Sequence, residues 1–127
     1  MSETQLMREI QVSAPPNVRL FRNQVGEAWQ GQILRSPDGS IYIKHPRLVS
    51  FGLAKGSSDL IGIEAVTITQ DMVGQTFGRF IALEVKLPTN YRRPEDQKDF
   101  IAMVRNLGGT ADFVNSVQNA AALIANT

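Results

Sequence analysis

The stretch from residue 79 to residue 116 limits the fold more than any other part of the chain. The apolar run RFIALEVKL reads as a strand, and the helix that follows it is marked at both ends. Pro94 suits the first helical position, the acidic Glu95 complements the helix dipole, and Gly108 suits the end. TADFVNS then reads as a further short strand, so helix and strand alternate here.

The rest of the chain adds a first helix, more strands and a hairpin. Ser2 and Gln5 fit a capping box for a helix that Pro15 and Pro16 end. NVRLFRNQV then alternates like a strand, and GQILRSPDGSIYIKHP has a turn signal between two β-rich runs. LIGIEAVTIT and RFIALEVKL are expected to be antiparallel neighbours, and SVQNAAALIAN a closing helix. This order of elements predicts an α/β fold in which helices pack on a compact mixed sheet.

Length and composition exclude several classes of protein. A chain of 127 residues is the size of one domain, so we expect a single domain over residues 1–127. The absence of cysteine excludes disulfides, thiolate catalysis and cysteine-based zinc sites. No apolar run approaches the roughly 20 residues of a membrane span, and the first residues do not read as a signal peptide. We therefore expect a cytoplasmic protein with no membrane partner.

The candidate chemistry is concentrated in the strand IALEVK. Alternate residues of a strand face the same side, so Glu84 and Lys86 project together. One interpretation is a half-exposed strand with a polar outer face. The other adds Asp59, because an antiparallel neighbour would bring that carboxylate close to Glu84. Two close carboxylates repel unless a cation lies between them, and magnesium or manganese prefers such oxygen ligands.

These residues and the segments around them resemble a known family. GSSD, which ends at Asp59, followed by LEVK resembles the PD-(D/E)XK nuclease core. RLFRNQVGEAW, FGLAKGSSDLIG, VTITQDMVGQ, FIALEVK and EDQKDFIAMVRNLGG are similar to the stand-alone, phage-type VRR-NUC branch, over nearly the whole chain. Ser58 stands where the motif has proline, a residue that stiffens the turn and supplies no ligand. The resemblance implies a restriction-endonuclease-like mixed sheet flanked by helices, with an additional β-hairpin.

The resemblance also implies roles for individual residues in the metal site. Asp59 and Glu84 would bind the metal, with the main-chain carbonyl of Val85 as a further ligand. Lys86 would orient or activate the attacking water and offset charge on the phosphate. Gln97 matches the family's helix glutamine, and its amide is then expected to point at the sheet near Lys86. The alternative for Gln97 is an exposed residue in the first turn of its helix.

The first helix supplies a further candidate ligand. Glu3 resembles the family's N-terminal helix glutamate, which completes the metal shell directly or through water. Its helical phase matches that of Leu6, Met7 and Ile10, the apolar stripe expected to face the core. Glu9 points roughly away from that stripe and is the alternative for the same role.

Other polar and aromatic residues have weaker signals. Arg22 and Asn23 resemble the family's "RN" pair and are candidate phosphate contacts, although a strand-end salt bridge explains Arg22 nearly as well. Lys55 lies in a turn where it could also line a phosphate-binding surface. His45, the single histidine, reads as a surface residue, and Trp29 reads as a core residue.

The resulting hypothesis is a structure-selective endodeoxyribonuclease that depends on Mg²⁺, with Mn²⁺ able to substitute. The resemblance implies hydrolysis of phosphodiester bonds in branched DNA such as four-way (Holliday) junctions. It also implies a homodimer, because one small domain has one site and symmetric cutting needs two. The expected setting is the cytoplasm of a bacterium or of a phage-infected host. The alternatives are a monomeric nickase or flap nuclease, and a catalytically silent DNA-binding module.

Overall fold

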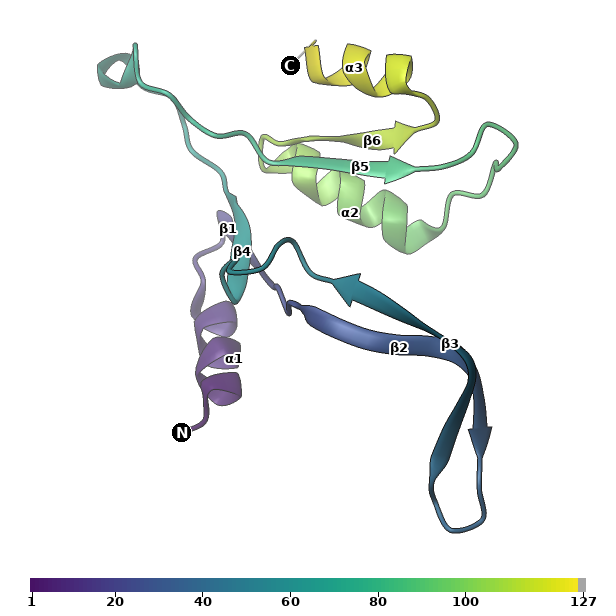
Figure 1. Cartoon of the computed structure of the whole chain (residues 1–127). Coiled ribbons are helices and arrows are strands. Elements are labelled where there is room, and N and C mark those ends of the chain that lie inside the picture. Colours follow the sequence, from purple (N-terminus) through teal and green to yellow (C-terminus); the bar gives the residue numbers. More distant parts are fainter. Residues whose placement is uncertain (126–127) are drawn as a thin grey trace. The chain divides into compact units, whose positions relative to one another are not determined.

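The computed structural model describes residues 1–125, which divide into two compact units that are interleaved in the sequence. The first unit consists of Met1–Val12 and Leu20–Ile61, and the second of Ser13–Arg19 and the described residues from Gly62 onward. Together they give a mixed α/β protein with small antiparallel and parallel sheets (Figure 1). Within the described residues, no helix is long and apolar enough to cross a membrane.

The second unit is built on a strand, a helix and a strand. β5 (Ile81–Val85) is followed by α2 (Glu95–Asn106) and by β6 (Thr110–Val114), which pairs with β5 in parallel. α3 (Val117–Ala125) closes the described chain, and α2 and α3 cover opposite faces of the β5–β6 pair (Figure 1). The predicted alternation of strand and helix is confirmed. Parallel strands need such a crossover because a tight turn cannot join them.

The core of the second unit lies between α2 and its strands. Its buried apolar side chains are Ile63, Ile101, Val104, Ala111 and Val114. The turn between α2 and β6 is tight, since a Cβ on Gly109 would lie 2.6 Å from a methyl carbon of Val104. Gly108 has a φ of +92°, the left-handed conformation that commonly ends a helix and that glycine adopts without strain.

The first unit holds the first helix and a long hairpin. α1 (Glu3–Ser13) begins with the predicted capping box, in which the Ser2 N–H donates to Gln5 Oε1 at 2.9 Å and the Gln5 N–H to Ser2 Oγ at 3.1 Å. The helix ends before Pro15, as expected.

β2 (Gly26–Arg35) and β3 (Ile41–Phe51) form the predicted antiparallel hairpin. Trp29 of β2 is 60% exposed, so the expectation that it lies in the core is wrong. Ser40 closes its turn by donating from its hydroxyl and its N–H to Asp38, and these bonds hold the pKa of that carboxyl below its ordinary value. The register shifts between Gln30 and Gln32, where His45 has a φ of +53°. This bulge interrupts the ladder halfway along the hairpin.

A third strand pair corrects one expectation about the sheet. β4 (Leu60–Glu64) pairs with β1 (Val18–Arg22), while β5 pairs with β6. The prediction that LIGIEAVTIT and RFIALEVKL are antiparallel neighbours is therefore wrong. Residues 65–80 contain only the short 3₁₀ turn η1 (Gln70–Met72) and no tight hairpin turn, and β6 takes the place beside β5.

Candidate functional site

Glu84 of β5 and Lys86, the residue directly after this strand, lie together on one face. Lys86 Nζ is 3.7 Å from Glu84 Oε1, and the Lys86 side chain is only 11% exposed, against 38% for Glu84. The alternate residues Val85 and Leu87 are 72% and 73% exposed. The shared face of Glu84 and Lys86 is thus confirmed. On that face Lys86 is largely covered and Glu84 is partly exposed, whereas Val85 and Leu87 on the other face are mostly exposed.

α2 carries the predicted glutamine in its first turn. Gln97 Oε1 is buried and has no hydrogen-bond partner among the described residues. Its main-chain N–H donates to Asp96 Oδ1 at 2.9 Å. The interpretation of Gln97 as an exposed first-turn side chain is therefore wrong. An unpartnered carbonyl oxygen in a buried place is costly, which makes it a candidate for a bound group.

Arg93 is one of several basic residues in or beside predicted turns and strand ends, where the sequence allows a phosphate-binding surface. Its guanidinium carbon lies 4.7 Å from the centre of the Phe113 ring, a cation–π contact. Phe113 is the register partner of Glu84 in the parallel ladder. Arg93 therefore adds a second cation beside the strand position that holds the carboxylate.

Asp59 lies in the first unit, at the end of the turn that precedes β4. It lines a small cavity of about 170 Å³ together with Arg22, Asn23 and Ser57, and Met7 of α1 contributes to the same wall. The structure thus brings together three of the predicted residues, Asp59, Arg22 and Asn23. Arg22 is exposed, whereas Asn23 is buried with 8% of its surface accessible.

Asn23 uses its amide within the protein. Nδ2 donates to Ser57 Oγ at 2.7 Å and to the Ser58 carbonyl at 2.9 Å, and Oδ1 accepts from the Leu53 N–H at 3.1 Å. Both amide hydrogens are therefore engaged by the turn before Asp59. A contact between Asn23 and a phosphate stays a prediction.

The remaining predicted residues of the first unit are exposed. Glu3 lies in the first turn of α1, and Met7, one turn further along, lines the Asp59 cavity. Residues four apart share a helix face, so Glu3 is on the Met7 side while Glu9 is not. Lys55 is exposed in the turn between β3 and β4.

The predicted metal ligands are divided between the two units. Asp59 and Glu3 belong to the first, and Glu84 and Val85 belong to the second. Within either unit, residues 1–125 hold no group of three or more histidine, aspartate or glutamate side chains that could bind a metal alone. The predicted four-ligand site therefore stays a prediction. The donors are carboxylate and carbonyl oxygens, which fit a hard divalent cation.

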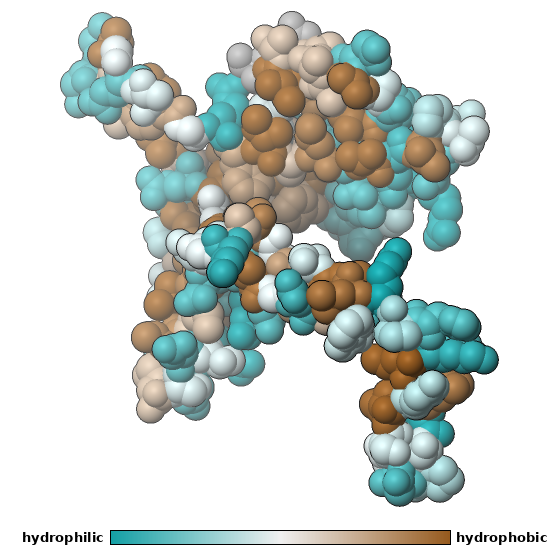
Figure 2. Space-filling view, in the orientation of Figure 1, coloured by the Kyte–Doolittle hydropathy of each residue, from teal (hydrophilic) through white to brown (hydrophobic). Residues whose placement is uncertain are grey.

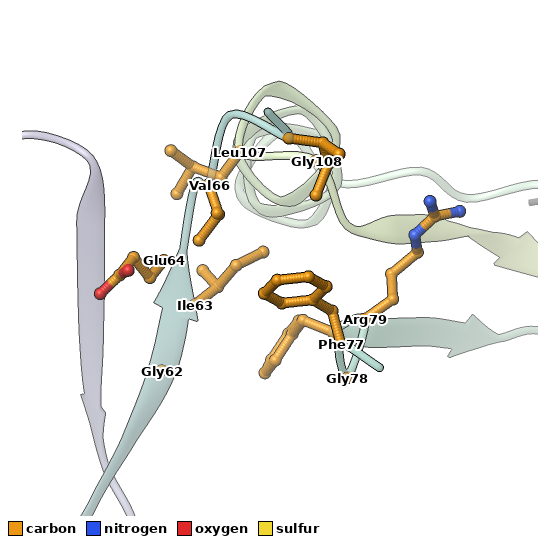
Figure 3. Close-up of a pocket in the computed structure, with 11 residues that line it drawn as sticks. Gly62, Ile63, Glu64, Val66, Phe77, Gly78, Arg79, Leu107 and Gly108 are labelled. Atoms are coloured by element: carbon orange, nitrogen blue, oxygen red, sulfur yellow. The ribbon is translucent and has the colours of Figure 1, made fainter. Parts of the chain in front are cut away.

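A larger cavity in the second unit was not anticipated. It measures about 590 Å³ and lies between the end of β4, the segment before β5 and the C-terminal end of α2. Ile63, Val66 and Phe77 line it, while the charged ends of Glu64 and Arg79 point away from its centre (Figure 3). Its lining is apolar and glycine-rich and brings no reactive group together.

These elements define a mixed α/β protein whose second unit holds a glutamate–lysine pair, and a helix packed against the same strands carries a glutamine with a buried oxygen. No protein-family model matches the chain, and no curated protein or solved structure matches it.

Proposed function

We propose that the protein is a metal-dependent DNA endonuclease of the PD-(D/E)XK type, with Asp59, Glu84 and Lys86 as its catalytic residues. The observation that carries the proposal is the Glu84–Lys86 ion pair, in which the Lys86 side chain is largely buried. A strand that served only as a scaffold would place Val85 and Leu87 inside and the charged residues in water, because burying charge is costly. A largely buried lysine charge beside exposed apolar neighbours supports a functional use of the charges.

Gln97 supports the same proposal. Its buried, unpartnered oxygen lies on α2, the helix that packs against β5 and β6. A hydrogen-bond donor such as an ordered water would satisfy it, and the attacking nucleophile in this chemistry is a water. Glutamate, lysine and glutamine thus supply an anion, a cation and a neutral acceptor within one unit.

In the proposed reaction the chain's own groups bind, orient and stabilise. A Mg²⁺ ion held by Asp59 and Glu84, when bound, would supply Lewis-acid stabilisation of the phosphate charge. The Lys86 ammonium donates hydrogen bonds only, so it can hold a water by its oxygen or offset the charge that develops on the phosphate. Because Lys86 is largely covered, its charge is less screened there than it would be in bulk water.

The proposed substrate is branched DNA, and the proposed assembly is a homodimer. Both come from the resemblance to stand-alone VRR-NUC nucleases, supported by the single Glu84–Lys86 pair in the chain. Cutting two strands of a four-way junction symmetrically requires two such sites. Arg22 and Lys55, both exposed, are the candidate phosphate contacts of the first unit.

The proposal is tested by cleavage of four-way junctions, flaps and linear duplexes in Mg²⁺ and in Mn²⁺. Asp59→Asn, Glu84→Gln and Lys86→Ala are each expected to abolish cleavage while the far-UV circular dichroism stays that of the wild type. Removing one charged group that acts in the transition state typically costs about 10²-fold or more in rate.

Lys98 and Glu95 offer a matched control. Their ion pair spans the same 3.7 Å, but Lys98 is 52% exposed and Glu95 is 81% exposed. Lys98→Ala and Glu95→Gln are therefore expected to cleave at nearly the wild-type rate. Near-normal turnover by any of the three site variants contradicts the assignment. DNA binding without cleavage by the wild type favours the silent DNA-binding module instead.

A further inference from the structure

The turn before Asp59 is closed by a network that centres on one buried side chain. Residues 52–58 leave β3 and return to Asp59, and Asn23 contacts both ends of this turn. Its Oδ1 accepts from the Leu53 N–H, and its Nδ2 donates to Ser57 Oγ and to the Ser58 carbonyl. Its main-chain N–H donates to the Asp59 carbonyl at 2.8 Å. Four bonds from one residue thus tie down the turn and the aspartate that follows it.

The hydrogen-bond partners of Asn23 require an asparagine at this position. The Ser57 hydroxyl donates its hydrogen to the Ala54 carbonyl at 2.6 Å, so it can only accept from Asn23. The Ser58 carbonyl can also only accept. Asn23 must therefore present two donors on one atom and an acceptor on the other, which an aspartate of the same shape cannot do.

Glycine allows the turn to close against Asn23. Gly52 has a φ of +89°, and a Cβ there would lie 2.7 Å from the Gln24 carbonyl oxygen. The turn therefore packs backbone against backbone directly beside Asn23. Gly56, with a φ of +87°, supplies the second left-handed position. Such a turn has little freedom of its own once the amide of Asn23 is in place.

We propose that Asn23 is a positioning residue that fixes the turn of residues 52–58 and thereby sets the place of the Asp59 carboxylate. The catalytic consequence of this inference rests on the proposed function. The clamp itself, by which we mean the hydrogen bonds that Asn23 makes to the turn, does not. Asn23 touches neither DNA nor metal in this role. It acts by restricting the main chain from which Asp59 projects. Asp59 needs such support because Ser58, unlike a proline, does not stiffen the turn.

The first test measures the clamp without any enzymatic activity. Amide hydrogen exchange of Ala54 and Ser57 is compared in the wild type, in Asn23→Asp and in Ser57→Ala. Both variants are expected to speed exchange at these amides by about tenfold, because each removes hydrogen bonds that close the turn. Ser57→Ala leaves Asn23 in place, and it provides the test if Asn23→Asp does not fold.

Asn17 supplies a matched control at the other end of the same strand pair. Its Nδ2 donates to the Ala65 carbonyl at 3.1 Å, and the Ala65 N–H donates to the Asn17 carbonyl at 2.8 Å. Asn17→Ala thus removes one side-chain bond beside β1 without touching the Asp59 turn. Unchanged exchange in both turn variants, or equal acceleration in Asn17→Ala, overturns the clamp.

The second test measures the catalytic consequence. Asn23→Asp and Ser57→Ala are expected to lower kcat for DNA cleavage by about 10- to 100-fold, the scale of a misplaced catalytic group, with KM for DNA changed less than about twofold. Asn17→Ala is expected to keep the wild-type kcat. Fast exchange in the turn with normal kcat overturns the positioning role. A wild-type protein that cleaves no DNA overturns the proposed function and the catalytic role together, while the exchange result still decides the clamp.

Discussion

Glu84, Lys86 and Gln97 are polar residues in places where a small α/β unit usually has apolar ones. The Lys86 side chain is 11% exposed, and Gln97 Oε1 is buried without a partner in the described residues. Val85 and Leu87 meanwhile face solvent. A fold selected for stability alone would reverse this arrangement, because buried polar groups without partners cost free energy. Stability and activity are therefore expected to oppose each other at these residues.

That opposition gives a prediction for Gln97→Leu. The leucine removes a buried oxygen that makes no hydrogen bond, so the free energy of unfolding is expected to rise by about 1 kcal/mol. Cleavage is expected to fall. Urea unfolding followed by circular dichroism, and junction cleavage by the same samples, measure the two effects.

Gln11→Leu is the control for this experiment. Gln11 Nε2 donates to the Leu20 carbonyl at 3.2 Å, so its loss is expected to lower the free energy of unfolding by about 1 kcal/mol. A Gln97→Leu protein that is destabilised as much as Gln11→Leu contradicts the prediction, because it shows that the oxygen has a partner.

At the scale of elements, the role of α1 depends on which of its residues share the helix face of Met7. It has no buried residue, and Leu6 and Ile10 are 48% and 42% exposed, so packing within the described structure holds it weakly. Its capping box defines where it starts, and Met7 on one face lines the Asp59 cavity. Glu3 shares the Met7 face, whereas Glu9 does not.

Glu3→Gln is therefore expected to weaken magnesium dependence where Glu9→Gln does not. The Mg²⁺ concentration for half-maximal cleavage is expected to rise by about 10- to 100-fold in Glu3→Gln, the usual effect of losing an outer ligand or its support. Both residues are exposed, so neither change is expected to alter stability by more than about 0.5 kcal/mol. Magnesium titrations of the two variants decide between them, and an effect confined to Glu9→Gln contradicts the phase argument.

At the scale of the whole molecule, the hairpin of the first unit carries the surface that we propose for dimerisation. Beyond the bulge, Ile33 pairs with Ile43, and Ile41 lies two residues along on the same face. Ile33 and Ile41 are each 56% exposed, and apolar side chains are visible along the hairpin (Figure 2). An isolated two-stranded hairpin is marginal in water, and a sustained apolar face marks an interaction surface. A second copy of the chain is the proposed partner.

Sedimentation at micromolar concentration is expected to show a homodimer. Ile33→Lys is expected to dissociate it, because the lysine would place a charge in the proposed interface. Gln32→Lys, one residue away on the opposite face, is expected to leave the dimer intact. The dissociated protein is expected to lose its preference for four-way junctions over linear duplexes. A monomeric wild type contradicts the dimer, and equal cleavage of junction and duplex contradicts the proposed selectivity.

The sequence by itself determined the elements whose causes are local. The capping box at Ser2, the turn residues of the hairpin and the glycine at position 108 act within a few residues, so they could be predicted from the chain alone. The alternation that puts Glu84 and Lys86 on one face is equally local. It specifies a shared face but not which side of the strand is covered.

Only the tertiary structure decided the strand partners and the exposure of each face. β5 pairs with β6 and not with β4, because the crossover through α2 brings distant residues together. The periodicity of apolar residues along a strand does not show which other strand pairs with it. The structure also gave Asn23 its place, since its partners at residues 53, 57 and 58 are far away in the sequence. An asparagine has no local preference for such partners, so the fold alone could assign it this role.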